Sequence, residues 1–157
     1  MKLILKKIVI RTFYIFFNPL RRLYWRLIKA KTRGVMCLIE NDGRFLFVRN
    51  SYGKGQWTLP GGRVKKRESF EEGVIREVRE EVGIKIEKPI LLGQYVNHKE
   101  GKTDTVSCFY CETASSNCKL DPIEIAEAKW LFLNEVPDFQ SHAVAKIIEM
   151  YKKYAGN

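Results

Sequence analysis

Short apolar runs separated by turn residues dominate the chain from residue 34 onward, and one stretch with helical spacing interrupts them. The run 35–39 is apolar and β-branched, and 44–49 places alternate residues on two faces. The tight-turn sequence Asn41-Asp42-Gly43 lies between these two runs, which predicts a β-hairpin. Further extended segments are expected at 84–86, 90–97, 105–112 and 128–133, with a loop at 98–104.

A helix is predicted over residues 70–82. The preceding sequence Ser69-Phe-Glu-Glu72 has the pattern of a capping box, and Gly83 suits the left-handed residue that ends a helix. A final helix is expected to start near Ser141. Strands and helices in this alternation predict an α/β domain.

The first 33 residues form a different kind of segment. A cationic start followed by apolar residues resembles a signal peptide, but Lys6, Lys7 and Arg11 interrupt the apolar run. The longest uncharged stretch, 12–20, is far shorter than the roughly 20 residues of a membrane-spanning helix. At helical spacing the apolar residues share one face and the cations another, so we expect an amphipathic helical arm at 1–33 joined to a domain at 34–157.

The charges separate the same two regions. The chain has 28 Lys and Arg against 18 Asp and Glu, and all ten excess cations lie in residues 1–33, which contain no acid. The domain is therefore neutral overall, and its binding to nucleic acid is disfavoured. Three roles stay open for the arm: packing on its own domain or on the partner of a homodimer, lying on an anionic membrane surface, and, least favoured, binding nucleic acid.

Four cysteines bear on the compartment. The chain is long enough for a core without disulfides, and no convincing export signal precedes them, so a reducing, cytoplasmic setting is expected. Cys108 and Cys111 lie in a strand-like run, where a spacing of three puts them on opposite faces. We therefore expect free thiols there and no zinc site.

The candidate chemistry lies in the helix at 70–82. Glu77, Glu80 and Glu81 stand at i, i+3 and i+4, which crowds three carboxylates onto one face. A solvated acidic face is the ordinary interpretation. The alternative is a Mg²⁺ or Mn²⁺ site beside the Gly61-Gly62 loop, because a divalent cation removes the repulsion among hard oxygen ligands.

A sequence motif favours the metal site. Gly62, Glu68, Arg76-Glu77-Val78, Glu80-Glu81 and Gly83-Ile84 match G-x5-E-x7-R-E-U-x-E-E-x-G-U at every defined position, where U is a bulky aliphatic residue. A chance match in a chain of this length is below roughly one in a million at average residue frequencies. The pattern is the Nudix box, and the chain resembles the Nudix hydrolase family over about residues 33–153.

This resemblance implies a Nudix-type α/β/α sandwich with a mixed β-sheet, and hydrolysis of a nucleoside diphosphate linked to another group, or of a nucleoside triphosphate, with Mg²⁺ or Mn²⁺. It implies that Glu77, Glu80 and Glu81 ligate the metal with the backbone carbonyl of Gly62. It also implies that Glu68 pairs with Arg76 to hold the loop against the helix, where the ordinary alternative is a surface ion pair of little consequence.

The general base stays open among three residues. Family members take it from the box, where Glu77 is the candidate, or from a later acidic loop, which Asp121 to Trp130 resembles. In that loop Glu124 is favoured over Glu127, and an ordinary solvated loop remains the alternative.

The substrate is less constrained than the chemistry. Arg49 is a candidate for phosphate binding, and Trp57 and Tyr95 for stacking on a base, although Trp57 is equally suited to the core. The Pro that marks relatives acting on ADP-ribose is absent at 99–100, and the Tyr that marks relatives acting on dinucleoside polyphosphates is absent at 101–103. Two alternatives to a general nucleotide pyrophosphatase remain: sanitising of oxidised nucleotides, and a non-catalytic nucleotide-binding regulator recruited to a membrane by its arm.

Overall fold

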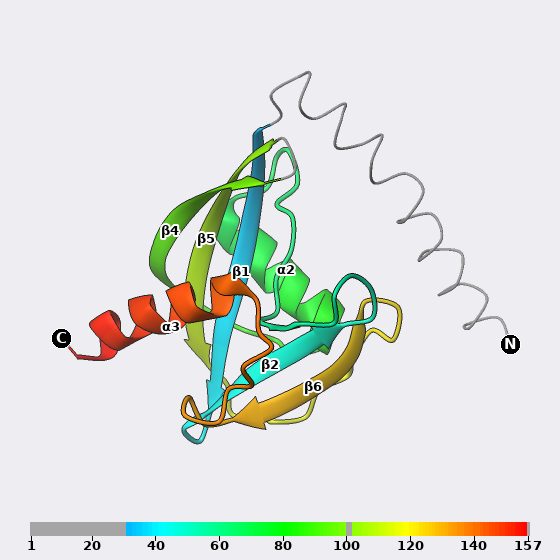
Figure 1. Ribbon diagram of the computed structural model, residues 1–157, viewed down its shortest axis with the longest axis vertical. Helices are drawn as coiled ribbons and strands as arrows, with labels where there is room; N and C mark the ends of the chain where they lie inside the picture. The colour runs from blue at the N-terminus through cyan, green and yellow to red at the C-terminus, as the bar shows by residue number, and fades with distance from the viewer. Residues whose placement is uncertain (1–30, 100–101, 157) are drawn as a thin grey trace, which may run out of the picture.

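A computed structural model describes residues 31–99 and 102–156, which form a mixed β-sheet between two helices (Figure 1). The strands are β1 (Lys31–Asn41), β2 (Arg44–Asn50), β3 (Trp57–Thr58), β4 (Ile90–Lys99), β5 (Lys102–Glu112) and β6 (Ile125–Leu131). Their order is β3-β2-β1-β5-β4. Strand β6 lies outside this order and pairs with β2. The pair β1–β5 is parallel and the other pairs are antiparallel, so the sheet is mixed. Residues 1–30, which make up most of the predicted arm, lie outside the described residues.

Two helices cover the two faces of this sheet and bury two separate cores. Helix α2 (Phe70–Val82) packs Val74, Val78 and Val82 on one face, against residues of β1, β2 and β5. Helix α3 (His142–Ala155) packs Val144 and Ile147 on the other face. Alternate residues of a strand point to opposite faces, so β1 contributes Cys37 to the first core and Leu38 to the second. The predicted α/β/α sandwich is confirmed.

The boundaries of α2 follow the local sequence. The Ser69 hydroxyl accepts from the Glu72 amide, the Glu72 carboxylate accepts from the Ser69 amide, and both bonds of the predicted capping box are present. At the other end Gly83 adopts the left-handed conformation, with φ of 71°, and its amide donates to the Arg79 carbonyl. The helix therefore spans the residues that the sequence predicts.

The loop Pro60–Val64 runs along an edge of β1 and fixes the position of the box. The amides of Val35 and Cys37 donate to the carbonyls of Gly62 and Pro60, both at 2.9 Å. The approach at Gly61 is so close that a Cβ atom there would lie 2.2 Å from the Val35 carbonyl oxygen, and its φ is +152°. Only glycine fits this position.

Several predicted boundaries differ from the structure. The predicted loop 98–104 is wrong, because β4 extends to Lys99 and β5 starts at Lys102, with Asn97 paired to Asp104. Backbone pairing near the tip of a hairpin does not require apolar side chains, so the polar composition was misleading. Strand β1 starts at Lys31, inside the predicted arm, and β6 starts at Ile125. The segment 84–86 forms no strand, although Ile84 and Ile86 are buried.

The cysteines lie as predicted. Cys108 belongs to the core under α3 and Cys111 to the core under α2, so the two sulfurs are on opposite faces of the sheet. All four thiols are free. Within residues 31–99 and 102–156, no helix is long and apolar enough to span a membrane.

Candidate active site

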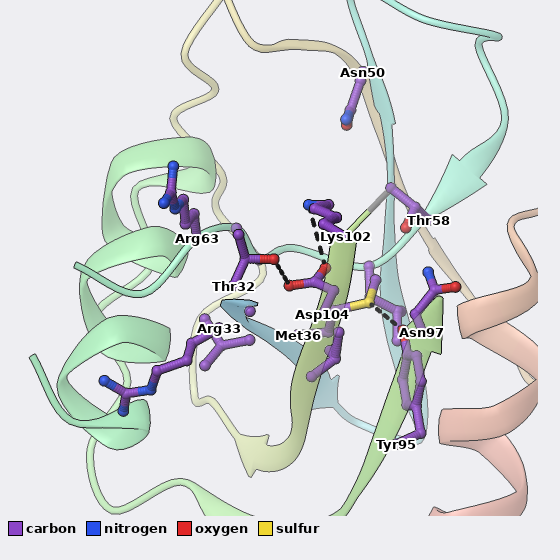
Figure 2. A pocket seen from close by; sticks show the side chains of 16 residues that line it. Thr32, Arg33, Met36, Asn50, Thr58, Arg63, Tyr95, Asn97, Lys102 and Asp104 are labelled. Atoms are coloured by element: carbon purple, nitrogen blue, oxygen red, sulfur yellow. Dashed lines mark hydrogen bonds and ion pairs between the residues drawn. The ribbon is translucent and has the colours of Figure 1, made fainter. Parts of the chain in front are cut away.

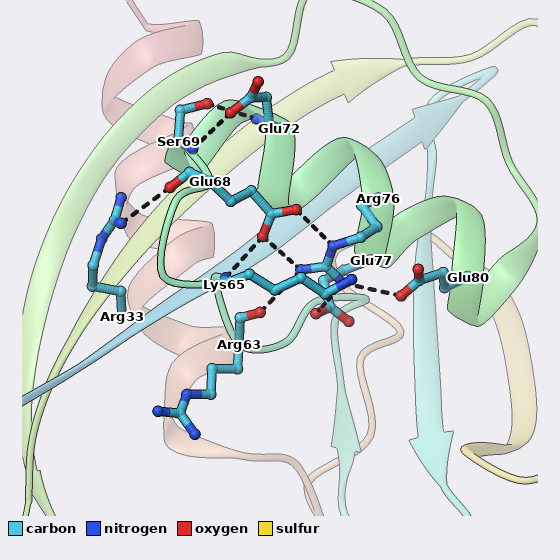
Figure 3. Close-up of polar contacts among 9 residues, drawn as sticks. All are labelled: Arg33, Arg63, Lys65, Glu68, Ser69, Glu72, Arg76, Glu77 and Glu80. Atoms are coloured by element: carbon cyan, nitrogen blue, oxygen red, sulfur yellow. Dashed lines mark hydrogen bonds and ion pairs between the residues drawn. The ribbon is translucent and has the colours of Figure 1, made fainter.

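The guanidinium group of Arg76 is the centre of the polar network on α2 (Figure 3). Its Nε and Nη2 donate to the two carboxylate oxygens of Glu68 at 2.6 and 2.8 Å, and Nη2 also donates to the Arg63 carbonyl at 3.0 Å. These bonds join α2 to the loop before it, and they lower the pKa of Glu68 to about 2. The predicted Glu68–Arg76 pair is therefore present, while its role in activity remains a prediction.

The same guanidinium group holds two of the three carboxylates among the candidate metal ligands. Its Nη1 donates to Glu77 at 2.7 Å and to Glu80 at 3.0 Å. The Glu77 carboxylate also lies against Gly62, where a Cβ atom would come within 2.5 Å of Glu77 Oε2. A side chain at position 62 would therefore displace Glu77 from the loop.

Glu81 is the buried member of the cluster. Its residue is 4% exposed, and its carboxylate accepts a hydrogen bond from the Gly61 amide at 2.8 Å. Burial raises the pKa of Glu81 to about 8, and the neighbouring carboxylates of Glu77, Glu124 and Asp121 add to the increase against the effect of the Gly61 bond. The surroundings of Glu81 in the described part of the chain therefore disfavour a negative charge on this carboxyl group.

Glu124 is brought to this cluster by a loop distant in sequence. The amides of Lys119 and Asp121 donate to the carbonyls of Val82 and Glu81 at the end of α2, at 2.8 and 2.9 Å. The Ser51 amide donates to the Glu124 carbonyl at 2.8 Å. Burial, followed by the charges of Asp121, Glu77 and Glu80, raises the pKa of the Glu124 carboxyl group.

Glu127, the other candidate base of the late loop, is engaged elsewhere. It lies opposite Arg49 in the β2–β6 pair and binds Arg49 at 2.5 Å and Lys129 at 3.1 Å. The hydrogen bond from Lys129, with a smaller contribution from Arg49, lowers the pKa of Glu127. The two candidate bases therefore differ in their surroundings: Glu124 lies near the acidic residues of the cluster, whereas Glu127 is paired with two cations.

The donor set fits a hard divalent cation. In the part of the chain that the structure describes, no three His, Cys, Asp or Glu side chains already lie within reach of a single ion, and Arg76 holds two of the candidates. Among residues 31–99 and 102–156, the buried carboxylate of Glu81 nevertheless forms no ion pair with a cation, and acidic neighbours surround it. Carboxylate oxygens in such excess are the ligands that Mg²⁺ and Mn²⁺ take.

A cavity of about 310 Å³ opens on the other side of the Gly61-Gly62 loop (Figure 2). Its floor includes Tyr95, whose hydroxyl points to the sulfur of Met36 at 3.8 Å. Asp104 accepts from the Thr32 hydroxyl at 2.5 Å and pairs with Lys102 at 3.6 Å. The polar lining side chains are Thr32, Arg33, Asn50, Thr58, Arg63, Tyr95, Asn97, Lys102 and Asp104.

Of the three predicted substrate residues, only Tyr95 lines this cavity. Trp57 is 8% exposed and belongs to the core under α3. Arg49 lies over the Trp57 ring, 5.8 Å from its centroid, and binds Glu127. The assignment of Arg49 and Trp57 to the substrate stays a prediction that their positions do not favour.

Thr32, Asn97 and Asp104 are cavity residues that the sequence analysis missed. They come from the ends of three neighbouring strands, and their pairing through β5 brings them together. One signal was available: Tyr95 and Asn97 alternate along one strand, as do Asp104 and Val106 along the next, and alternate residues share a face. This alternation does not predict which strands are neighbours in the sheet.

The fold is that of Nudix proteins, and the chain belongs to the Nudix family: the NUDIX domain model matches residues 30–151. The protein is therefore a hydrolase of the class that acts on pyrophosphate bonds. An ADP-ribose pyrophosphatase from Methanocaldococcus jannaschii is 31% identical over 121 residues, which cover 74% of this chain and 70% of that protein. Nudix hydrolase 6 from Arabidopsis thaliana is 36% identical over 112 residues, but these span only 38% of its length.

Solved structures agree with this assignment. The crystal structure of a MutT protein from Methanosarcina mazei superposes with a TM-score of 0.72 at 30% identity, over 82% of this chain and 98% of that one.

Proposed function

We propose that this protein hydrolyses a diphosphate bond in a nucleoside diphosphate linked to another group, NDP-X, or in a nucleoside triphosphate, with Mg²⁺ or Mn²⁺ as cofactor. The observation that carries the proposal is the buried carboxylate of Glu81, which lies against the Gly61 amide among other acidic groups. The cavity beside the same loop is large enough for a nucleoside.

The residues of the box divide into two roles. Glu77, Glu80 and Glu81, with the Gly62 carbonyl, would hold the metal, which supplies charge neutralisation of the diphosphate and activation of water. The Gly62 carbonyl already accepts from the Val35 amide, so its second lone pair is the one that would serve. Arg76 and Glu68 are positioning residues: they hold the loop and α2 in place relative to each other.

Glu124 is the base that this geometry supports best. The raised pKa of Glu124 makes its carboxylate a stronger base, which suits a group that accepts a proton from the attacking water. Glu127 is less suited, because its carboxylate is bound to Arg49 and Lys129 and its pKa is lowered. Glu77 remains the candidate inside the box.

NDP-X compounds and nucleoside triphosphates are both candidate substrates, because the names of related proteins include an ADP-ribose pyrophosphatase and a nucleoside triphosphatase. ADP-ribose itself is not singled out, because residues 99 and 100 are Lys and Glu where the family marker is Pro. Oxidised nucleoside triphosphates are a further candidate class. The substrate panel of the first prediction distinguishes the candidate classes.

The first prediction tests the metal chemistry. The purified protein should hydrolyse at least one compound in a panel of NDP-X compounds and nucleoside triphosphates when Mg²⁺ or Mn²⁺ is present. The reaction is measured by the release of nucleoside monophosphate, phosphate and pyrophosphate. Glu81→Gln should lower kcat/KM by more than about tenfold, because it removes a ligand charge. Glu149→Gln is the control, since that residue pairs with Lys153 on the solvent side of α3. Undiminished activity in excess EDTA would contradict the proposal.

A further inference from the structure

A second cavity, of about 630 Å³, lies beside the first, and most of its lining residues are Lys or Arg. Its residues come from the start of β1 and from the loop between Gly62 and α2. They are Lys31, Thr32, Arg33, Arg63, Val64, Lys65 and Lys66, and we call this cavity the basic cleft. Five of the seven are Lys or Arg, and none is acidic.

No carboxylate among the described residues balances these charges. Among residues 31–99 and 102–156, the side chains of Lys31, Arg63 and Lys66 form no ion pair. The nearest acid along the chain, Glu68, is engaged by Arg76 and by the Lys65 amide. The segment 1–30 cannot supply the missing charge either, because it contains eight Lys and Arg and no Asp or Glu. Among the described residues the basic cleft therefore carries an excess of positive charge, which attracts anions.

The position of the basic cleft relates it to catalysis. It shares Thr32, Arg33 and Arg63 with the cavity that holds Tyr95 and Asn97. In Figure 2 the guanidinium groups of Arg33 and Arg63 point away from Asn97 and Thr58. Arg63 directly follows Gly62, and its carbonyl is held by Arg76. The two cavities are therefore adjacent, and a ligand that extends out of the first cavity past these shared residues reaches the cations of the basic cleft.

One of the cations, Arg33, is already oriented. Arg33 donates to the Glu68 carbonyl at 3.0 Å and lies over the Phe70 ring, 4.3 Å from its centroid. The β1 backbone and the loop are joined by the bond from the Val64 amide to the Arg33 carbonyl at 2.9 Å. The two walls of the basic cleft are thus fixed relative to each other, and a preorganised cluster of cations binds an anion at lower entropic cost.

We propose that the basic cleft is an anion subsite, which binds a phosphate or carboxylate carried by the X group of an NDP-X substrate. This inference rests on the proposed function and adds a preference for substrates with an anionic X over those with a neutral X. The anion can belong to a soluble nucleotide or to a lipid headgroup, and the chemistry of recognition is the same for both.

The main test compares two substrates that differ only in charge. UDP-glucose and UDP-glucuronate share the nucleotide and the sugar ring, and the second carries a carboxylate at C6. The full chain should show a ratio of kcat/KM that favours UDP-glucuronate by about tenfold at low salt, and the double variant Lys31→Ala/Lys66→Ala should lower this ratio about fivefold or more. The control Lys85→Ala/Lys152→Ala removes two exposed lysines that do not line the basic cleft, and should leave the ratio unchanged. A ratio near one, or an equal change in both double variants, would overturn the proposal.

A binding measurement separates this proposal from the proposed function. Inorganic tripolyphosphate, titrated into the full chain in EDTA, should bind about fivefold more weakly to Lys31→Ala/Lys66→Ala than to the control variant, whether or not either sugar nucleotide is hydrolysed. Equal binding by the two variants would overturn the subsite even if the enzyme is active.

Vesicles identify the source of the anion. Mixed phosphatidylglycerol and phosphatidylcholine vesicles are added to the UDP-glucuronate assay. Inhibition that Lys31→Ala/Lys66→Ala abolishes would assign the basic cleft to a lipid headgroup, and activity that is unaffected by vesicles would assign it to a soluble anion. Inhibition that is the same in both double variants would place vesicle binding elsewhere, and it would overturn the lipid assignment.

Discussion

At the scale of single residues, Arg76 connects three carboxylates of the box to the loop before α2. Its guanidinium group contacts Glu68, Glu77, Glu80 and the Arg63 carbonyl, and its side chain is only 12% exposed. An ion pair so enclosed is screened less by solvent than a surface pair. The ordinary alternative for Glu68 and Arg76, a surface ion pair of little consequence, is thus disfavoured by their burial and by the number of partners that they share.

The prediction for Glu68 concerns its role as a positioning residue. Because Glu68 touches Arg76 and the Lys65 amide and none of the candidate ligands, Glu68→Gln should lower activity less than Glu81→Gln does. Metal affinity, measured by titration of Mn²⁺, should likewise fall less. A larger loss of Mn²⁺ affinity at Glu68 than at Glu81 would show that the ligands are assigned wrongly.

The lowered pKa of Glu68 gives a pH-dependent prediction for stability. Its hydrogen bonds with Arg76 lower the pKa from 4.5 to about 2 in the folded protein. The stabilisation is complete above pH 4.5 and is lost as the pH falls toward 2, because the unfolded chain binds the proton first. Glu68→Gln should therefore reduce the free energy of unfolding by about 1 kcal/mol at pH 7 and by less at pH 3, in urea denaturation. The exposed Glu71→Gln is the control, and a deficit independent of pH would contradict the linkage.

At the scale of elements, the start of α2 sets where its carboxylates lie. The two reciprocal bonds between Ser69 and Glu72, at 2.7 and 3.1 Å, fix the first turn of the helix. Gly83 fixes the last turn through its bond to the Arg79 carbonyl. Because both ends are specified locally, the rotation of the helix that directs Glu77 and Glu81 toward the loop is specified as well.

The element-scale prediction is a comparison of two helix caps. Ser69→Ala removes the capping box and should destabilise the protein by about 1 kcal/mol, seen as a Tm lower by a few degrees. Ser141→Ala is the matched control at the start of α3, where the N-cap side chain makes no capping bond and its hydroxyl instead contacts Thr58 at 3.3 Å. A cost at Ser141 equal to that at Ser69 would show that the capping bonds are not the cause.

At the scale of the whole molecule, the described residues form two core clusters between the sheet and the helices α2 and α3. The members of these clusters that the structure describes lie beyond residue 34. The arm, in contrast, holds eight of the Lys and Arg residues in its first 30 positions and no acid. We therefore keep the interpretation of this segment as a separate basic arm, with an anionic membrane surface or a second copy of the chain as its partner.

The molecule-scale prediction concerns removal of this arm. A chain that begins at Ala30 retains all of β1, and it should fold and keep most of its activity. The full chain should bind anionic vesicles at low salt and release them as salt rises, whereas the shortened chain should not bind. A second truncation that begins at Val35 removes the pairing of 31–34 with β5 and the bond from Thr32 to Asp104, so it should be less stable. Loss of folding in the first truncation would mean that the arm packs on the domain.

The sequence alone determined the family, the helix α2 and the carboxylates that this helix carries. These follow from local features: the box has fixed spacing along one chain segment, and capping signals and helical period act between residues a few positions apart. The opposite placement of Cys108 and Cys111 was readable for the same reason, because the alternation of a strand is a local property.

Only the tertiary structure decided what surrounds the box. Glu124 joins Glu81 through hydrogen bonds between residues about 40 positions apart, and Glu127 is separated from it by pairing with Arg49 across β2 and β6. Tyr95, Asn97 and Asp104 meet Thr32 only because β1 is parallel to β5, and Lys31 meets Lys66 only because the loop runs along β1. No local rule specifies which strands become neighbours, since that choice depends on how the whole chain buries both faces of its sheet.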